Sequence, residues 1–427
     1  MESFDAIIVG AGLSGLSAAY ALAKEGLDVL VLERGDYPGA KNVSGGRLYL
    51  NPVRELFPDL WEKAPFERHI AHEEFCLMDR ARAVTVRYEG AELDEKPQSF
   101  SVLRAKLDRW LAKEAQGHGA AIVCKTRVDG LIMENGRVAG IRAGGDELRS
   151  AVVIACDGAL SRIAQGAGLA GAHAPKHFAT GYKEVIEMDR GVIEDRFNLE
   201  GDQGTARLYL GDPTAGRLGG GFIYTNKESL SIGVVAGIDA MTGSEPACGA
   251  AALLDAFKKR PEVARLLRGG ETVEYSSHVI PEGGLAGMPR LFGDGILVAG
   301  DAAGLAMNLG ITVRGMEYAL ASGYYAARTV IEAKKTEDFG VSALARYPRM
   351  LAESFVMKDF TAFKNAPRVL DNPRFFSRYP QLAGGLLRDL YEVPAGVKER
   401  LYKTARRHFT VKEMFAMARD LAGVRKV

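Results

Sequence analysis

The stretch FDAIIVGAGLSGLSAAYALAKEGLDVLVLER, residues 4–34, decides the fold of this chain. A β-branched run over Asp5–Val9 leads into a glycine turn, an amphipathic segment follows over Leu13–Glu25, and a second apolar run covers Val29–Leu32. A strand, a helix and a strand within about 30 residues form a unit with parallel strands, and parallel sheets are covered on both faces. The stretch therefore predicts a doubly wound α/β domain.

The turn between the first strand and the helix has the G-x-G-x-x-G spacing of a dinucleotide-binding unit. Its first glycine permits the tight turn, the second lets a diphosphate approach the backbone, and the third lets the helix pack on the strand. The helix N-terminus favours the negative charge of the diphosphate, and Glu33, at the end of the second strand, is placed to accept hydrogen bonds from ribose hydroxyls. The candidate residues of this Rossmann-like unit are Gly10, Gly12, Ser14, Gly15, Glu33 and Arg34.

A second motif lies far along the chain, where residues 295–304 read GILVAGDAAG. It resembles the second FAD fingerprint of the glutathione-reductase-like flavoproteins, which implies that Asp301, after Gly300, holds a ribityl hydroxyl. A role as a helix N-cap is the alternative for Asp301. The Asn308–Ile311 turn, with Gly310 and Ile311, is expected to open a helix over Thr312–Glu332 whose N-terminus faces the flavin.

Residues 155–162 read ACDGALSR and resemble the Asp-Gly motif of flavoprotein hydroxylases, which implies that Asp157 and Gly158 close over the FAD region. Arg104, near the start of a helix expected over Ser101–Gln116, matches the arginine that this family places near the diphosphate. A solvated charge is the alternative for Arg104. Val128, which opens a predicted strand, completes the candidate cofactor contacts. Three separated motifs for one cofactor predict FAD, and the scattered cysteines predict no metal site.

The length of 427 residues predicts more than one sub-structure. Alternating segments between residues 180 and 280 predict an antiparallel sheet. We expect a discontinuous FAD-binding domain over 1–75, 101–170 and 285–345. An inserted substrate or quinone domain is expected over 76–100 and 171–284, and a mostly helical region over 346–427.

A more specific resemblance begins at residues 39–49, which read GAKNVSGGRLY. With residues 219–224, 231–234 and 300–316, this segment resembles the FixC-type branch of the electron-transfer-flavoprotein:quinone oxidoreductases, to which geranylgeranyl reductases are related. The resemblance implies that electrons arrive from an electron-transfer flavoprotein with alpha and beta subunits, rest on FAD, and leave to a membrane quinone. It places Ser44, Gly45, Gly46 and Arg47 close to the flavin ring; a surface loop charge is the alternative for Arg47.

The cysteine pattern departs from the mitochondrial-type oxidoreductases, which carry a four-cysteine iron–sulfur cluster in a C-terminal segment. This chain has no cysteine after Cys248. The FixC branch uses a separate small ferredoxin-like subunit, so the resemblance implies a multi-subunit complex, and one that bifurcates electrons. Lys398–Val427 carries nine lysines or arginines, which suit an acidic ferredoxin or anionic lipid, or are simply a solvated helix face.

The expected location is the cytoplasm, with peripheral attachment to the inner face of the cytoplasmic membrane and no transmembrane helix. Segments 56–61, 355–363 and 375–387 are candidates for membrane contact, or for core or subunit contacts. The net charge of +1 argues against a nucleic-acid partner. Three other functions stay open: a geranylgeranyl-reductase-like isoprenoid reductase, a flavin-dependent aromatic hydroxylase, and a subunit whose flavin does not turn over.

Overall fold

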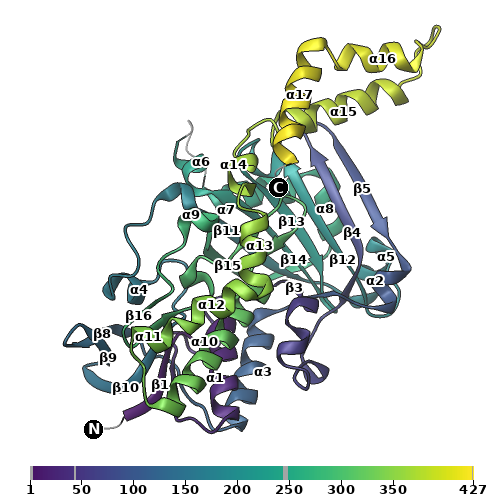
Figure 1. Cartoon of the computed structure of the whole chain (residues 1–427). Helices are drawn as coiled ribbons and strands as arrows, with labels where there is room; N and C mark the ends of the chain where they lie inside the picture. Colours follow the sequence, from purple (N-terminus) through teal and green to yellow (C-terminus); the bar gives the residue numbers. More distant parts are fainter. Residues whose placement is uncertain (1–2, 43–44, 244–248, 426) are drawn as a thin grey trace.

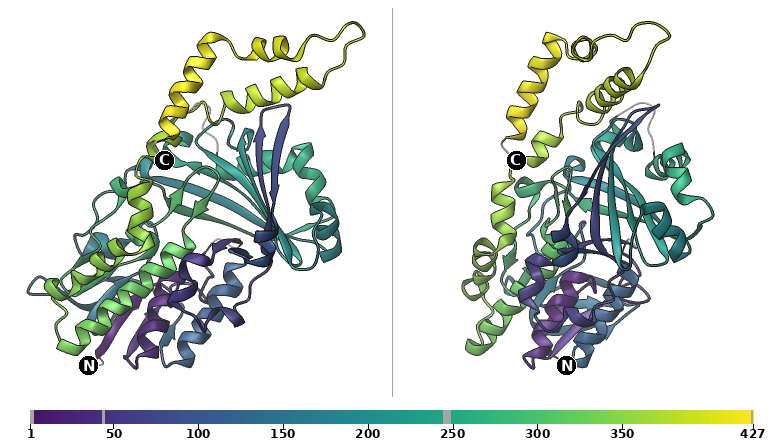
Figure 2. Two further views of the ribbon diagram at one scale, coloured as in Figure 1. Left: turned by 45° about the vertical axis from the view of Figure 1, so that its right-hand side comes forward. Right: turned by 90° about the vertical axis from the view of Figure 1, so that its right-hand side faces the viewer.

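The body of the molecule contains two sheets, and a helical arm extends from it at the end remote from the N-terminus (Figures 1 and 2). The computed structural model describes residues 3–42, 45–243, 249–425 and 427. The predicted α/β class with a helical C-terminal region is confirmed.

The first sheet is built around β1 (Ser3–Val9), which pairs in parallel with β2 on one side and β10 on the other. Ala6, Ile7 and Ile8 are buried, as expected for a strand covered on both faces. Val9 lies opposite Leu32 and Ala155, so the three strands end together at one edge. The order is β16 (Phe292–Gly293), β17 (Ile296–Val298), β10 (Asp146–Ala155), β1, β2 (Val29–Leu32) and β7 (Ala121–Val123), with β9 (Arg137–Ala143) and β8 (Val128–Glu134) antiparallel beyond β10.

Three helices pack together beside this sheet, because α1 (Leu13–Lys24) contacts both α10 (Met316–Thr336) and α3 (Arg104–Gly117). Two predicted helix starts are wrong. Ser99–Val102 forms strand β6 before α3 begins, and Val313–Arg314 (β19) pairs back on Met307–Asn308 (β18) before α10 begins. Pairing with an earlier strand outweighed the helical pattern at both places. Other helices of the body are α4 (Arg162–Gly166), α9 (Gly284–Gly287), α11 (Val341–Leu344), α12 (Arg346–Glu353) and α13 (Phe355–Ala362).

The second sheet is mixed. Strand β4 runs parallel to β12, and the other described strand pairs of this sheet are antiparallel. Strands β3, β4 and β6 come from residues 46–102, so the first hundred residues contribute to both sheets. The predicted domain limits remain a prediction. The strand order of the second sheet is β15 (Glu271–Pro281), β11 (Phe178–Glu187), β14 (Ser229–Gly237), β13 (Gly219–Thr225), β12 (Gln203–Gly211), β4 (His69–Met78), β6 and β3 (Gly46–Tyr49), and β5 (Ala83–Glu89) pairs with β4. The helices of this part of the chain are α2 (Ala91–Glu95), α5 (Arg190–Phe197), α6 (Ile238–Thr242), α7 (Ala250–Lys259) and α8 (Pro261–Leu267).

The arm consists of α15 (Arg378–Tyr391), α16 (Leu401–His408) and α17 (Val411–Val424), and it follows α14 (Ala366–Leu370). Arg374 Nη2 lies 2.7 Å from Glu413 Oε2, and Arg374 Nε lies 3.0 Å from Asp420 Oδ2. These ion pairs attach α17 to the root of the arm.

The apolar segments proposed for membrane contact largely face the core. The side chains of Phe57, Trp61, Phe360 and Phe376 are buried, so the core alternative holds at these positions. Among the described residues, no helix is both long and apolar enough to span a bilayer.

Candidate functional site

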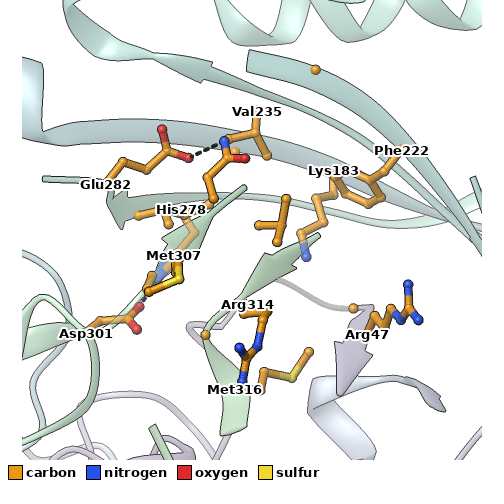
Figure 3. Close-up of a pocket in the computed structure, with 18 of the residues that line it drawn as sticks. Arg47, Lys183, Phe222, Val235, His278, Glu282, Asp301, Met307, Arg314 and Met316 are labelled. Atoms are coloured by element: carbon orange, nitrogen blue, oxygen red, sulfur yellow. Dashed lines mark hydrogen bonds and ion pairs between the residues drawn. The ribbon is translucent and has the colours of Figure 1, made fainter. Parts of the chain in front are cut away.

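One cavity reaches from the glycine turn of the first sheet to the second sheet. Figure 3 shows the part of it around Lys183, His278 and Asp301. Residues from β1–α1, β11, β13, β15 and the start of α10 face it. A ligand in this space therefore touches both sheets at once.

The glycine turn is as tight as its motif predicts. Gly10 has a φ of +103°, and a Cβ there would lie 2.5 Å from the carbonyl oxygen of Cys156. A Cβ on Gly15 would lie 2.0 Å from the carbonyl oxygen of Gly10. The space beside Gly12 is free, because a Cβ added there would lie 3.9 Å from Asn42 Nδ2 and 4.0 Å from Arg104 Nη2. Larger side chains would close the approach to the backbone at the first turn of α1.

Glu33 lies where β2 ends and is buried. Its Oε2 accepts a hydrogen bond from the amide of Ala11 at 2.9 Å, and its Oε1 accepts one from the amide of Gly35 at 2.6 Å. A carboxylate accepts more than one hydrogen bond per oxygen, so it can also accept hydroxyl donors. The contact fixes the carboxylate beside the glycine turn.

Arg104 supplies a cation at the same turn. Its Nε lies 2.8 Å from Asp108 Oδ1, and Asn42 Nδ2 donates to the other oxygen of Asp108 at 2.6 Å. Asp108 is buried, so this carboxylate orients both Arg104 and Asn42 toward the cavity that they line. Arg104 is thus held in the wall of the site and is not a solvated charge at the helix start.

Asp301 lies in the single 3₁₀ turn Gly300–Ala303, after β17. It lines the cavity, and its Oδ2 lies 3.4 Å from Nε2 of His278 on β15 (Figure 3). Its carboxylate therefore faces the cavity and the second sheet. Gly300 has a φ of +67°, and its amide donates to Ser322 Oγ at 2.9 Å.

The structure separates the predicted site residues into two groups. Asp157 does not line the cavity; its carboxylate accepts hydrogen bonds from the Ser161 hydroxyl and the Ile163 amide at the start of α4. Ser44 lies outside the described residues. The predicted residues that line the cavity are Gly12, Ser14, Gly45, Gly46, Arg47, Arg104, Gly158, Asp301 and Gly310; Gly10, Gly15, Glu33, Arg34, Val128, Gly300 and Ile311 are not among the lining residues.

Arg47 and Arg314 both line the cavity with their charges already paired. Arg47 is buried, and it forms hydrogen bonds to both carboxylate oxygens of Glu73 and, through Nε, to Ser99 Oγ at 3.0 Å. Arg314 lies 2.7 Å from Glu317 and 2.6 Å from Asp359. Arg47 is therefore not the surface loop charge that the sequence allowed.

Lys183 on β11 is the cation of this cavity for which the described residues include no ion pair. Its ammonium group points into the cavity and donates to the carbonyl oxygen of Gly45 (Figure 3). Burial, helped by the nearby charge of Arg104, lowers the pKa of Lys183 to about 7, while Glu274 opposes the shift. A positive charge is thus available beside the Gly45–Gly46 loop near neutral pH.

The far end of the cavity is mostly apolar. Phe222 and Val235 come from the second sheet, and Leu370 and Phe376 come from the root of the arm. Glu282 accepts a hydrogen bond from Asn308 Nδ2 at 3.3 Å, and burial raises the pKa of its carboxyl group. This end suits a flat apolar ring that carries few polar atoms.

Sequence reasoning missed Lys183, His278 and Glu282. One signal was available for Lys183, since the alternation of β11 places it on the same face as Ala179, Gly181 and Val185, where a charge is unusual. His278 and Glu282 had no local signal, because their role depends on how β15 meets the loop after β17.

These residues fit FAD. The open backbone at Gly12 beside Arg104 suits a diphosphate, the fixed carboxylate of Glu33 suits a ribose, and Asp301 faces the cavity between them and the apolar end. The start of α10, at Gly315 and Met316, also faces the cavity, as expected for a helix that meets the flavin.

Known proteins agree with this assignment. The FAD binding domain family matches residues 3–188. Protein FixC of Escherichia coli O157:H7 is 47% identical over 408 residues, with 95% of each chain covered. The probable electron transfer flavoprotein-quinone oxidoreductase YdiS of E. coli K12 is 43% identical, with 92% of this chain and 91% of that protein covered.

Among solved structures, a geranylgeranyl bacteriochlorophyll reductase-like protein from Thermoplasma acidophilum has the same fold. The TM-score is 0.73 at 23% identity, with 99% of this chain and 100% of that chain covered. The chain therefore belongs to the FixC family and is an FAD-binding oxidoreductase.

Proposed function

We propose that this protein passes electrons from an electron-transfer flavoprotein, through its FAD, to a quinone of the membrane. The observation that carries the proposal is that one cavity joins a nucleotide cradle, the ammonium group of Lys183 and an apolar end. FAD, when bound, accepts and donates electrons singly or in pairs. The protein's own residues hold the cofactor, shield the apolar end from water, and place a cation where a carbonyl oxygen of the acceptor would need a hydrogen bond.

The protein acts, in this proposal, within a complex that also contains both electron-transfer-flavoprotein subunits and a small ferredoxin-like protein, and that bifurcates electrons. The similarity to FixC and YdiS over most of the chain supports the proposal. The absence of cysteine after Cys248 in the sequence supports a separate subunit for the iron–sulfur cluster. We place the protein at the inner face of the cytoplasmic membrane.

The test is rapid mixing of the reduced holoprotein with a short-chain, water-soluble quinone, followed through flavin absorbance. We expect fast reoxidation of the flavin by the quinone. In a second experiment, a reduced electron-transfer flavoprotein should reduce the flavin of the oxidised holoprotein. Leu370→Asp should raise the quinone concentration needed for half-maximal rate, because it puts a carboxylate in the apolar end. Val341→Asp, at an exposed position on α11, is the matched control.

A second candidate is reduction of an isoprenoid double bond, since the apolar end of the cavity and the shared fold of the Thermoplasma protein also suit that chemistry. A reduced isoprenoid product, with no response of the flavin to quinone, would replace the first proposal with this one.

A further inference from the structure

The arm exposes large apolar side chains that the rest of the described chain leaves uncovered. At its tip, between α15 and α16, Tyr391, Val393 and Val397 are 81%, 80% and 98% exposed. Leu401 and Tyr402 continue this surface into α16. Apolar groups collected on one projecting element mark a contact surface rather than ordinary surface scatter.

Helix α17 adds an apolar stripe of its own. Val411, Met414, Phe415 and Leu421 are exposed at the spacing of one helix face, and Ala418 lies between them. The opposite edge of α17 is fixed by the pairs of Arg374 with Glu413 and Asp420, so the stripe faces away from this attachment.

The charge around these apolar groups is strongly positive. Arg400, Lys403, Arg406 and Arg407 are exposed at α16, and Lys412, Arg419 and Arg425 are exposed on or beside α17. Residues 391–425 thus carry these seven exposed cations and only two exposed acids among the described residues, Glu392 and Glu399. Glu399 is paired with Arg407 at 2.9 Å. Apolar side chains flanked by an excess of cations are typical of surfaces that lie in the headgroup layer of an anionic bilayer.

The position of the arm fits such a bilayer. It projects from the body on the side remote from the N-terminus in all three ribbon views (Figures 1 and 2). Leu370 and Phe376, at its root, form part of the apolar end of the cavity. A bilayer that receives the arm therefore lies on the side of the molecule where Leu370 and Phe376 line the apolar end of the cavity.

We propose that the outer face of the arm, formed by residues 391–403 and α17, binds the interface of an anionic lipid bilayer. The inference rests on the proposed function, because it gives the quinone a short path from lipid to the cavity. An acidic protein partner is the other occupant that this charge could attract, and the test separates the two.

The experiment is flotation of the holoprotein with vesicles of phosphatidylcholine alone or mixed with phosphatidylglycerol. We expect binding to the mixed vesicles that weakens with added salt. Met414→Ser with Phe415→Ser should weaken this binding about tenfold or more through lost apolar burial. Arg400→Gln with Lys403→Gln should weaken it about thirtyfold, from about 1 kcal/mol per cation near the surface.

Matched controls lie on the body: Val273→Ser with Tyr275→Ser for exposed apolar groups, and Lys63→Gln with Lys113→Gln for exposed cations. Flavin content and denaturant unfolding check that each variant is folded. The controls should bind vesicles like the unmodified protein.

The assignment is overturned if the unmodified protein does not bind mixed vesicles, or if both arm variants bind them like the controls. It is also overturned if the arm variants keep vesicle binding but lose a purified acidic ferredoxin-like subunit, since the arm is then a protein interface. Reoxidation by a water-soluble quinone should be unchanged in the arm variants. Loss of that reaction in the unmodified protein would contradict the proposed function, whatever the vesicles show.

Discussion

At the scale of single residues, the site depends on carboxylates that hold other groups in position. Glu33 accepts hydrogen bonds from the amides of Ala11, in the nucleotide turn, and Gly35, after β2. Asp108 orients Arg104 and Asn42, and Asp301 lies 3.4 Å from His278. In each case a carboxylate helps to fix the position of another polar group of the site.

Glu33→Ala and Asp301→Ala should each weaken FAD retention, because each removes hydrogen bonds to a charged group worth roughly 1.5–3 kcal/mol. The measurement is flavin released on dialysis, with Asp36→Ala, an exposed neighbour of the turn, as the control. Full flavin occupancy in either variant would remove that residue from the predicted site.

Lys183→Met should change how the stability of the flavin-free protein depends on pH. The pKa of Lys183 is about 7 in the folded chain against 10.5 in the unfolded chain, so the unfolded state binds the extra proton between these values. The buried ammonium group lowers the free energy of unfolding by its full amount below pH 7, and this destabilisation falls as the pH rises toward 10.5.

The variant should therefore be more stable than the unmodified protein near pH 6, by on the order of 5 kcal/mol, and the difference should fall to about 2 kcal/mol near pH 9. Urea unfolding at the two pH values measures both numbers. A difference that does not change with pH would show that Lys183 titrates as in an unfolded chain.

At the scale of elements, the fold requires α1 and α10 to approach very closely. A Cβ on Gly323 of α10 would lie 2.0 Å from the carbonyl oxygen of Ser14, in the first turn of α1. Ser17 Oγ donates to the carbonyl oxygen of Leu320 at 2.5 Å along the same contact. The spacing of these helices therefore helps to set the position of the nucleotide turn.

Gly323→Ala should destabilise the protein by about 3 kcal/mol and weaken flavin binding, because the helices must separate. Gly117→Ala on α3 is the control: an added Cβ there meets nothing within 4 Å, so a gain of about 0.5–1 kcal/mol is expected. Urea unfolding measures both. Equal stability of the two variants would show that the α1–α10 contact can relax at little cost.

The sequence predicted the elements whose signal is local. Strand β8 begins at Val128 as predicted, and the alternating segments expected between residues 180 and 280 form antiparallel strand pairs, because alternation and flanking turn residues determine them. The start of α10 and the strand β6 were missed because pairing with a distant or earlier strand decides them. The glycine motif predicted the turn whose Gly12 and Ser14 line the cavity, whereas Lys183 and His278 reach the cavity only because the two sheets meet.

At the scale of the whole molecule, ion pairs attach helix α17 to the root of the arm, while α15 packs on β4 and β5. Arg374 and Arg378 lower the pKa of Glu413. Burial opposes ionisation of Asp420, but hydrogen bonds from Tyr379 and Arg374 outweigh it and lower its pKa. Both carboxylates are therefore ionised where ordinary ones begin to protonate, and the attachment is complete above their usual pKa values.

This attachment should be lost as pH falls through the lowered pKa values of Glu413 and Asp420, before the body unfolds. Hydrogen–deuterium exchange over α17, residues 411–424, measures it, with the strands of the first sheet as the internal reference. Asp420→Asn should raise exchange in α17 at neutral pH while flavin stays bound. Protection of α17 that persists until the first sheet opens would contradict the prediction.

The contact between α1 and α10 also has a consequence for synthesis on the ribosome. Ser17 and Leu320 are 303 positions apart, so the nucleotide-binding turn lacks one of its supports until about three quarters of the chain has been made. Until then, the apolar face of α1 and one side of β10 are uncovered. The nascent chain should therefore depend on chaperones through most of translation, and it should capture its cofactor only near the end.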